Sequence, residues 1–83
     1  MKIQFVQVGS GWEIREMYGR FTYQIRGQIR LVTMDGSVWW KVEFHTGESW
    51  YADVQDILLL FDLSEMYLSG GYESVLTEIQ GGT

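Results

Sequence analysis

The side chains that could carry acid–base or metal chemistry are few and poorly spaced for it. His45 is the only histidine and the chain has no cysteine, so a thiol nucleophile and a thiolate metal site are excluded. Glu43 and His45 point to the same side of a predicted strand, but two such ligands do not make a metal site. Asp53 and Asp56 stand three residues apart, a spacing suited to capping a helical turn. We therefore expect no enzyme, no metal and no cofactor.

Strict alternation of apolar residues predicts the elements that would position any site. Two alternating runs flank Asp35-Gly36, a dipeptide that favours a tight hairpin turn. Pairing Met34 with Ser37 gives a hairpin with one apolar face, and it places Gly27 opposite Phe44. A slip of one residue would destroy this match. The apolar residues of the two runs are Phe21, Tyr23, Ile25, Ile29, Leu31, Val38, Trp40, Val42 and Phe44.

Further strands are predicted on both sides of this hairpin. Residues 2–8 and 12–17 form two runs around Gly9-Ser10-Gly11, which we interpret as a hairpin turn and not as a phosphate-binding loop. A three-residue loop at Thr46-Gly47-Glu48 would start the last hairpin. That loop pairs Phe44 with Trp50, Val42 with Ala52, and Lys41 with Asp53. Core residues then lie opposite core residues, and Lys41 lies opposite a residue of opposite charge.

The C-terminal third changes to helical spacing. We expect a helical turn at 53–56, a short strand at 58–61, and a helix that Asp62 caps and Gly70-Gly71 ends. A second helix is predicted over 72–80. The apolar stripe of both helices is expected to pack on the sheet, and it is also a candidate homodimer surface. Its members are Leu63, Met66, Tyr67, Tyr72, Val75, Leu76 and Ile79.

Length and composition predict a single domain. The 83 residues divide into a β-barrel or meander over 1–61, a helical segment over 62–80 and a tail at 81–83. The sequence contains no run of ~20 apolar residues and no apolar signal-peptide core within 1–20. We therefore expect no membrane association. The absence of cysteine fits a reducing compartment, and we expect a cytoplasmic location.

Charge is distributed unevenly along the chain. Residues 1–41 carry six Lys/Arg and three acids, and residues 42–83 carry eight acids and no Lys/Arg, so +3 and −8 give the net −5. We expect no nucleic-acid partner, because duplex DNA requires a basic footprint. The acidic half either neutralises the basic half within the chain or offers a surface to a basic partner, and the sequence leaves both readings open.

A segment of about 33 residues carries a family resemblance. It runs through Asp35-Gly36, a strand ending in Lys41-Val42-Glu43-Phe44, then Thr46-Gly47-Glu48, Trp50-Tyr51, a helical turn and a closing aliphatic strand at 58–60. Residues 28 to 60 thus resemble the core of a small Src-homology-3-type (SH3-like) barrel of the Tudor kind. The resemblance implies a mostly β fold with short α-helices. The antiparallel sheet would be highly curved and form a small barrel of five to six strands. The N-terminal hairpin and the two short C-terminal helices, which we predict from the spacing of apolar residues, lie outside the resemblance.

The resemblance also implies a function, which is one of the two that we consider. Tudor-like domains often bind methylated Lys or Arg in an aromatic cage with an acid nearby, because ring faces attract cations. Trp39 and Tyr51 face outward by register, with Glu43 and Asp53 beside them. The resemblance therefore implies, as the alternative function, a ligand-reading domain for a methylated side chain or a small metabolite.

The function predicted first is a non-catalytic protein-binding module. It would bind another protein through exposed aromatic residues and an acidic surface. Many protein–protein interfaces have such a composition, with aromatic anchor residues surrounded by a charged rim. In composition the chain is similar in character to small phage-encoded inhibitors of host enzymes or defence systems. The predicted partner-binding residues are Trp39, Tyr51, Glu43, Asp53, Glu65, Glu73 and Glu78.

Overall fold

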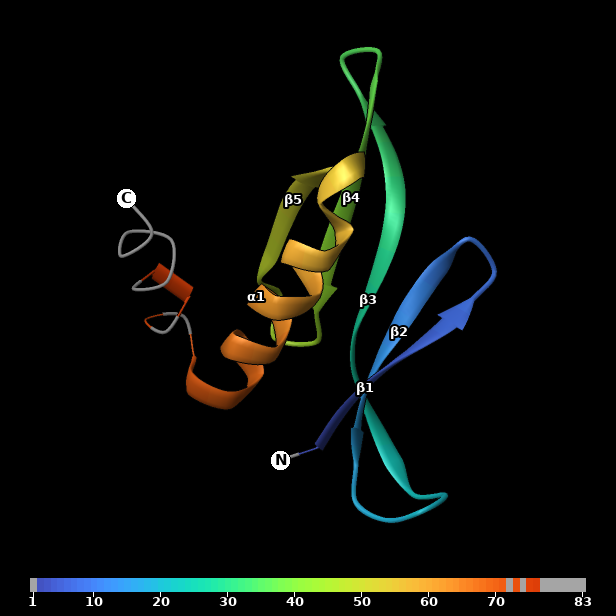
Figure 1. Cartoon of the computed structure of the whole chain (residues 1–83), viewed down its shortest axis with the longest axis vertical. Helices are drawn as coiled ribbons and strands as arrows, with labels where there is room; N and C mark the ends of the chain where they lie inside the picture. Colours follow the sequence, from blue (N-terminus) through green and yellow to red (C-terminus); the bar gives the residue numbers. More distant parts are fainter. Residues whose placement is uncertain (1, 72, 74, 77–83) are drawn as a thin grey trace.

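Five antiparallel strands form one sheet, with a helix packed against it (Figure 1). The structure is a computed structural model that describes residues 2–71, 73, 75 and 76. Within these residues the sheet is unclosed, with β1 and β5 at its edges, so the mostly β fold is confirmed but closure into a barrel is not. The elements are β1 (Lys2–Val8), β2 (Gly11–Met17), β3 (Tyr23–Met34), β4 (Ser37–Phe44), β5 (Ser49–Asp53), the 3₁₀ turn η1 (Val54–Asp56) and α1 (Ile57–Gly70).

The central β3–β4 hairpin has the register predicted from the sequence. Met34 pairs with Ser37, and the ladder continues without a shift to Gly27 opposite Phe44. Asp35 and Gly36 have φ values of 51° and 79°. Two positive φ values in a two-residue loop define a type I′ turn, whose twist matches that of the flanking strands. The turn therefore fixes the register that the apolar alternation favours.

The β4–β5 register differs from the prediction by two residues. Val42 pairs with Trp50, and Lys41 with Tyr51. The loop has the predicted length but comes one residue earlier, because the N–H of Phe44 donates to the Glu48 carbonyl oxygen at 2.9 Å and Phe44 thus lies opposite Glu48. A shift of two preserves the faces of a strand, so Trp50 still lies on the core side. The predicted pairing of Lys41 with Asp53 is wrong, since Asp53 lies opposite Trp39.

A β-bulge interrupts the β2–β3 ladder. Ile14 pairs with Gly27, but the next residue, Arg15, pairs with Ile25, so Arg26 is the extra residue of the bulge. A bulge reverses the face to which the following side chains point, relative to uninterrupted alternation. The predicted single apolar face of β3 is therefore split between the two sides of the sheet.

The C-terminal region is more helical than predicted. The prediction of a strand at 58–61 is wrong, because these residues belong to α1. Asp62 lies inside α1 and is exposed, so it does not cap the helix, whereas Gly71 does end it with φ 79° and an N–H bond to the Tyr67 carbonyl oxygen at 2.8 Å. Of the second helix predicted over 72–80, the described residues 73, 75 and 76 are helical. The rest of that prediction and the tail at 81–83 lie outside the described residues.

The core lies between α1 and one face of the sheet. Helical spacing brings Ile57, Leu60, Phe61 and Leu68 of α1 to the core, where the Phe61 ring lies 4.6 Å from that of Phe5. In Figure 1, α1 lies across β4 and β5. The opposite face of the sheet has no helix of the described chain on it, and we call it the open face. The buried centre consists of Ile14, Ile29, Trp40, Val42, Phe44 and Leu60.

Candidate protein-binding face

The open face is lined by strand residues that alternate with the core residues. Because Val42 and Phe44 are buried beneath α1, their neighbour Glu43 points to the open face, and cross-strand partners share its side. This face is neither uniformly polar nor uniformly apolar. Its main side chains are Glu13, Arg15, Tyr23, Ile25, Gln28, Arg30, Trp39, Lys41, Glu43 and Tyr51.

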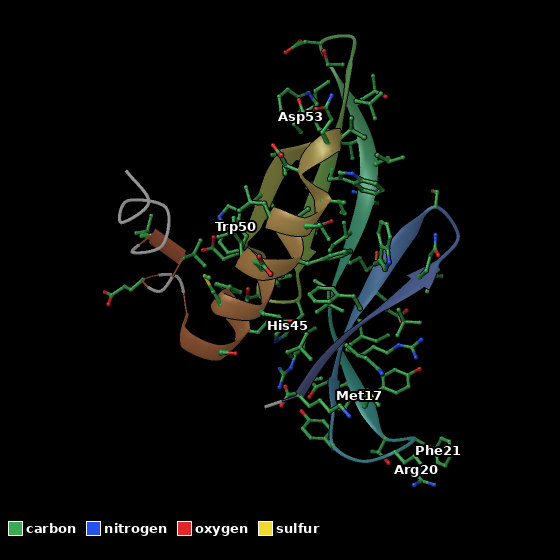
Figure 2. The ribbon with its side chains drawn as sticks, in the orientation of Figure 1. Met17, Arg20, Phe21, His45, Trp50 and Asp53 are labelled. Atoms are coloured by element: carbon green, nitrogen blue, oxygen red, sulfur yellow. The ribbon has the colours of Figure 1, made fainter. Side chains whose placement is uncertain are left out.

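An apolar strip runs along the first half of β3. Tyr23 and Ile25 are 41% and 45% exposed, whereas Ile29 is 1% exposed. Simple alternation along β3 would place all three side chains on the same face. The bulge at Arg26 accounts for the difference, since Ile25 pairs with Arg15 on the open face. Phe21, in the β2–β3 loop just before β3, is 87% exposed, and Figure 2 shows it next to Arg20.

Two predicted aromatic residues, Trp39 and Tyr51, also lie on the open face. Tyr51 is 47% exposed and Trp39 is half-buried. Lys41 lies opposite Tyr51, and its Nζ is 5.7 Å from the centroid of the Tyr51 ring. This distance lies within the range of a cation–π contact. The ring of Tyr51 therefore already faces a cation of the same chain.

The charges of the open face largely neutralise one another. Nε of Arg15 lies 2.7 Å from a carboxylate oxygen of Glu13, and its guanidinium carbon lies 4.2 Å from the centroid of the Tyr23 ring. Arg30 lies 3.5 Å from Glu43 across the β3–β4 ladder. The face therefore offers aromatic and aliphatic groups among paired charges, and it is not an acidic surface.

The two acids predicted to serve an aromatic cage have other partners. Glu43 lies opposite Ser49 and pairs with Arg30. Asp53 accepts a 3.0 Å hydrogen bond from the Gln55 N–H and so caps η1. A cage would leave a carboxylate free to face the ligand cation, and neither acid is placed for this.

Of the remaining predicted acids, Glu65 does not lie on the open face together with the aromatic residues. Glu65 is exposed on α1, which packs against the other side of the sheet. Glu73 is exposed and follows α1. Glu78 lies outside the described residues. The structure thus separates Glu65 from Trp39 and Tyr51, which the sequence had combined into one surface.

A polar cluster that the sequence did not predict surrounds Arg26. Its Nε donates to Glu16 at 2.6 Å, and its other nitrogens contact the Tyr18 hydroxyl and His45 Nε2, both at 3.2 Å. The hydrogen bond that Arg26 donates to the Glu16 carboxylate is the largest cause that raises the pKa of Arg26. The cluster borders a pocket of about 410 Å³ beside the end of α1, lined also by Thr46, Glu48, Tyr67, Leu68 and Gly71.

The lone histidine belongs to this cluster. His45 Nδ1 lies 3.1 Å from the Arg26 carbonyl oxygen, which can only accept, while Nε2 faces an Arg26 N–H, which can only donate. These contacts favour the tautomer in which Nδ1 donates to the Arg26 carbonyl oxygen and Nε2 accepts from the guanidinium. The sequence predicts that Arg26 lies opposite His45. It does not predict the contact between Arg26 and Glu16, because that contact depends on the bulge.

The described residues contain no group of three or more His, Asp or Glu side chains arranged to hold a metal ion. Among the described residues, no helix combines the length and the apolar character needed to cross a membrane. No protein-family model, curated protein or solved structure matches this chain.

Proposed function

We propose that the chain is a non-catalytic protein-binding module whose partner docks on the open face. One observation carries the proposal. The bulge at Arg26 turns Tyr23 and Ile25 to the face that already holds Trp39 and Tyr51. The face thus carries two partly exposed apolar groups, separated along β3 by Gln28 and Arg30, and no described helix covers them. Aromatic and branched side chains left exposed on a sheet face are typical of a docking surface.

The chemistry of the face defines the partner. Because Arg15 and Arg30 already have carboxylate partners, the partner need not be strongly charged. It would offer an apolar patch with polar groups at its rim, as many transient interfaces do. Small phage-encoded inhibitors of host enzymes could act by such docking. The exposed acids of α1 would contribute by long-range attraction of a basic partner.

The ligand-reading alternative has less support. It requires Trp39 and Tyr51 to enclose a cation with a carboxylate nearby. Lys41 lies over the Tyr51 ring, and Glu43 is paired with Arg30. We therefore place the protein-binding function first.

Two matched substitutions test the location of the docking surface. Ile25→Asp puts a charge on the open face, and Leu59→Asp puts the same charge on α1, where Leu59 is 52% exposed. We expect proteins captured from a cell lysate by the immobilised chain to be lost with Ile25→Asp and retained with Leu59→Asp. Both variants should keep the wild-type melting temperature, because both sites are exposed. Capture of no protein by the wild type, or loss only with Leu59→Asp, would contradict the proposal.

A further inference from the structure

In the part of the chain that the structure describes, β1 forms an edge of the sheet with little to protect it. β1 pairs with β2 in an unbroken register from Lys2 opposite Met17 to Val8 opposite Gly11, and no described strand pairs with its other side. α1 lies mainly over β4 and β5, at the other end of the sheet, although its Phe61 ring also reaches the Phe5 ring of β1 (Figure 1). Natural proteins protect such edges with charges, proline or bulges. β1 has none of these except Lys2 at its start.

The hairpin turn determines which backbone groups of β1 point outward. Gly9 and Ser10 form a two-residue turn, with Gly9 at φ 61°, so the flanking Val8 and Gly11 form a hydrogen-bonded pair. Hydrogen-bonded and non-hydrogen-bonded pairs alternate along an antiparallel ladder. The N–H and C=O groups of Val8, Val6 and Gln4 therefore point to β2. Those of Gln7, Phe5 and Ile3 point away from the sheet.

We propose that a second copy of this chain pairs with β1 through these outward groups. An antiparallel arrangement with its two-fold axis at Phe5 pairs Phe5 with Phe5 of the other copy and Ile3 with Gln7. Every outward group then meets an outward group, giving about six N–H···O bonds, two for each hydrogen-bonded pair. A slip of one residue would oppose outward to inward groups, and a slip of two would lose one of the pairs. The strand is therefore complementary to itself in one best register.

Side-chain packing supports the same register. Phe5 is half-buried at the sheet edge, and its ring packs on Phe61, which in turn lies 5.3 Å from the ring of Trp12. Both copies of Phe5 would lie on the α1 side at the axis, so this aromatic row would continue into the second copy. Lys2 would lie opposite Val8, so no like charges meet.

The pairing would join two sheets into one continuous sheet with both open faces on the same side. This proposal does not depend on the open-face partner, because an edge and a face are different surfaces. It also differs from dimerisation through the C-terminal apolar stripe, which would leave β1 free.

A proline substitution tests the edge. Gln7→Pro removes an outward N–H and no bond to β2, whereas the control Gln7→Thr changes the side chain and keeps the N–H. We expect sedimentation velocity to show a dimer for the wild type and for Gln7→Thr. In Gln7→Pro the dissociation constant should rise at least about tenfold, because both copies lose a donor. A wild-type chain that remains monomeric up to about 1 mM would overturn the proposal.

Cysteine pairs test the register even if Gln7→Pro fails to fold. The native chain has no cysteine, and the proposed register brings Gln4 of one copy opposite Val6 of the other in a close, non-hydrogen-bonded pair. The double variant Gln4→Cys/Val6→Cys should form a covalent dimer on mild oxidation. The single variant Gln4→Cys should remain mostly monomeric on a non-reducing gel. Equal cross-linking of the two variants, or none in the double variant, would contradict the register.

Discussion

Gly27 lies directly opposite Phe44, and the missing side chain of one makes room for the ring of the other. A Cβ on Gly27 would lie 2.7 Å from the Glu43 carbonyl oxygen and 3.3 Å from Cδ1 of Phe44. Gly27→Ala should therefore destabilise the protein by about 1–3 kcal/mol, the usual cost of overpacking. Gly19→Ala is the matched control, because its Cβ would meet nothing closer than 4.0 Å. Equal urea midpoints for the two variants would refute this account of Gly27.

Phe44 should be far more important for stability than Lys41, although the two are close in β4. Phe44 is 3% exposed and packs against Trp50 and Tyr67, with ring centroids 5.2 and 4.5 Å away. Phe44→Ala should cost about 3–5 kcal/mol. Lys41→Ala should cost at most about 1 kcal/mol, because it removes one exposed contact with the Tyr51 ring. Urea unfolding measures both, and similar losses would show that the faces of β4 are wrongly assigned.

The cluster around Arg26 should require a guanidinium and not merely a positive charge. A lysine cannot contact Glu16, Tyr18 and His45 at once, because its donors sit on a single nitrogen. We expect Arg26→Lys to lower the melting temperature. Arg20→Lys, at the exposed tip of the β2–β3 loop, should leave it unchanged (Figure 2). If both substitutions had the same small effect, the cluster would contribute nothing specific to the bulge.

Charge reversal should affect partner binding differently on the two sides of the sheet. Glu65→Lys on α1 should slow association slightly and leave dissociation unchanged, because Glu65 does not lie on the open face. Glu43→Lys should speed dissociation, since it breaks the pair with Arg30 on the open face. Surface plasmon resonance at two salt concentrations separates the two rates. Strongly salt-dependent binding that Glu65→Lys abolishes would favour an acidic docking surface on α1 instead.

The accuracy of the sequence-based prediction differed between elements for physical reasons. Asp35-Gly36 specifies a turn type, and a slip of one residue would expose the core, so the β3–β4 register was predictable. The β4–β5 register was not, because shifting it by two residues keeps every side chain on its face. The run from Ile57 to Phe61 is apolar throughout and shows no period, so it could be read as a strand or as a helix.

The candidate site could be predicted only in part. Trp39 and Tyr51 were assigned to the outward face from local alternation, which the β4–β5 shift of two preserves. The exposure of Tyr23 and Ile25 was not predictable, because the bulge depends on how β3 pairs with β2 and leaves no mark on the alternation of β3 itself. The separation of Glu65 from the aromatic residues depends on which face of the sheet α1 covers.

The strand order has a consequence for how the chain reaches its fold. Each strand pairs with its neighbour in the sequence, so the sheet can grow by successive hairpins that each close only a short loop. The contact between Phe5 and Phe61 is different, since it joins the first strand to the helix near the other end of the chain. Closing the loop between Phe5 and Phe61 costs the least entropy once the hairpins have formed, because the hairpins shorten the distance between these two residues. The sheet can thus form from local contacts, and the docking of α1 is the long-range step that completes the core.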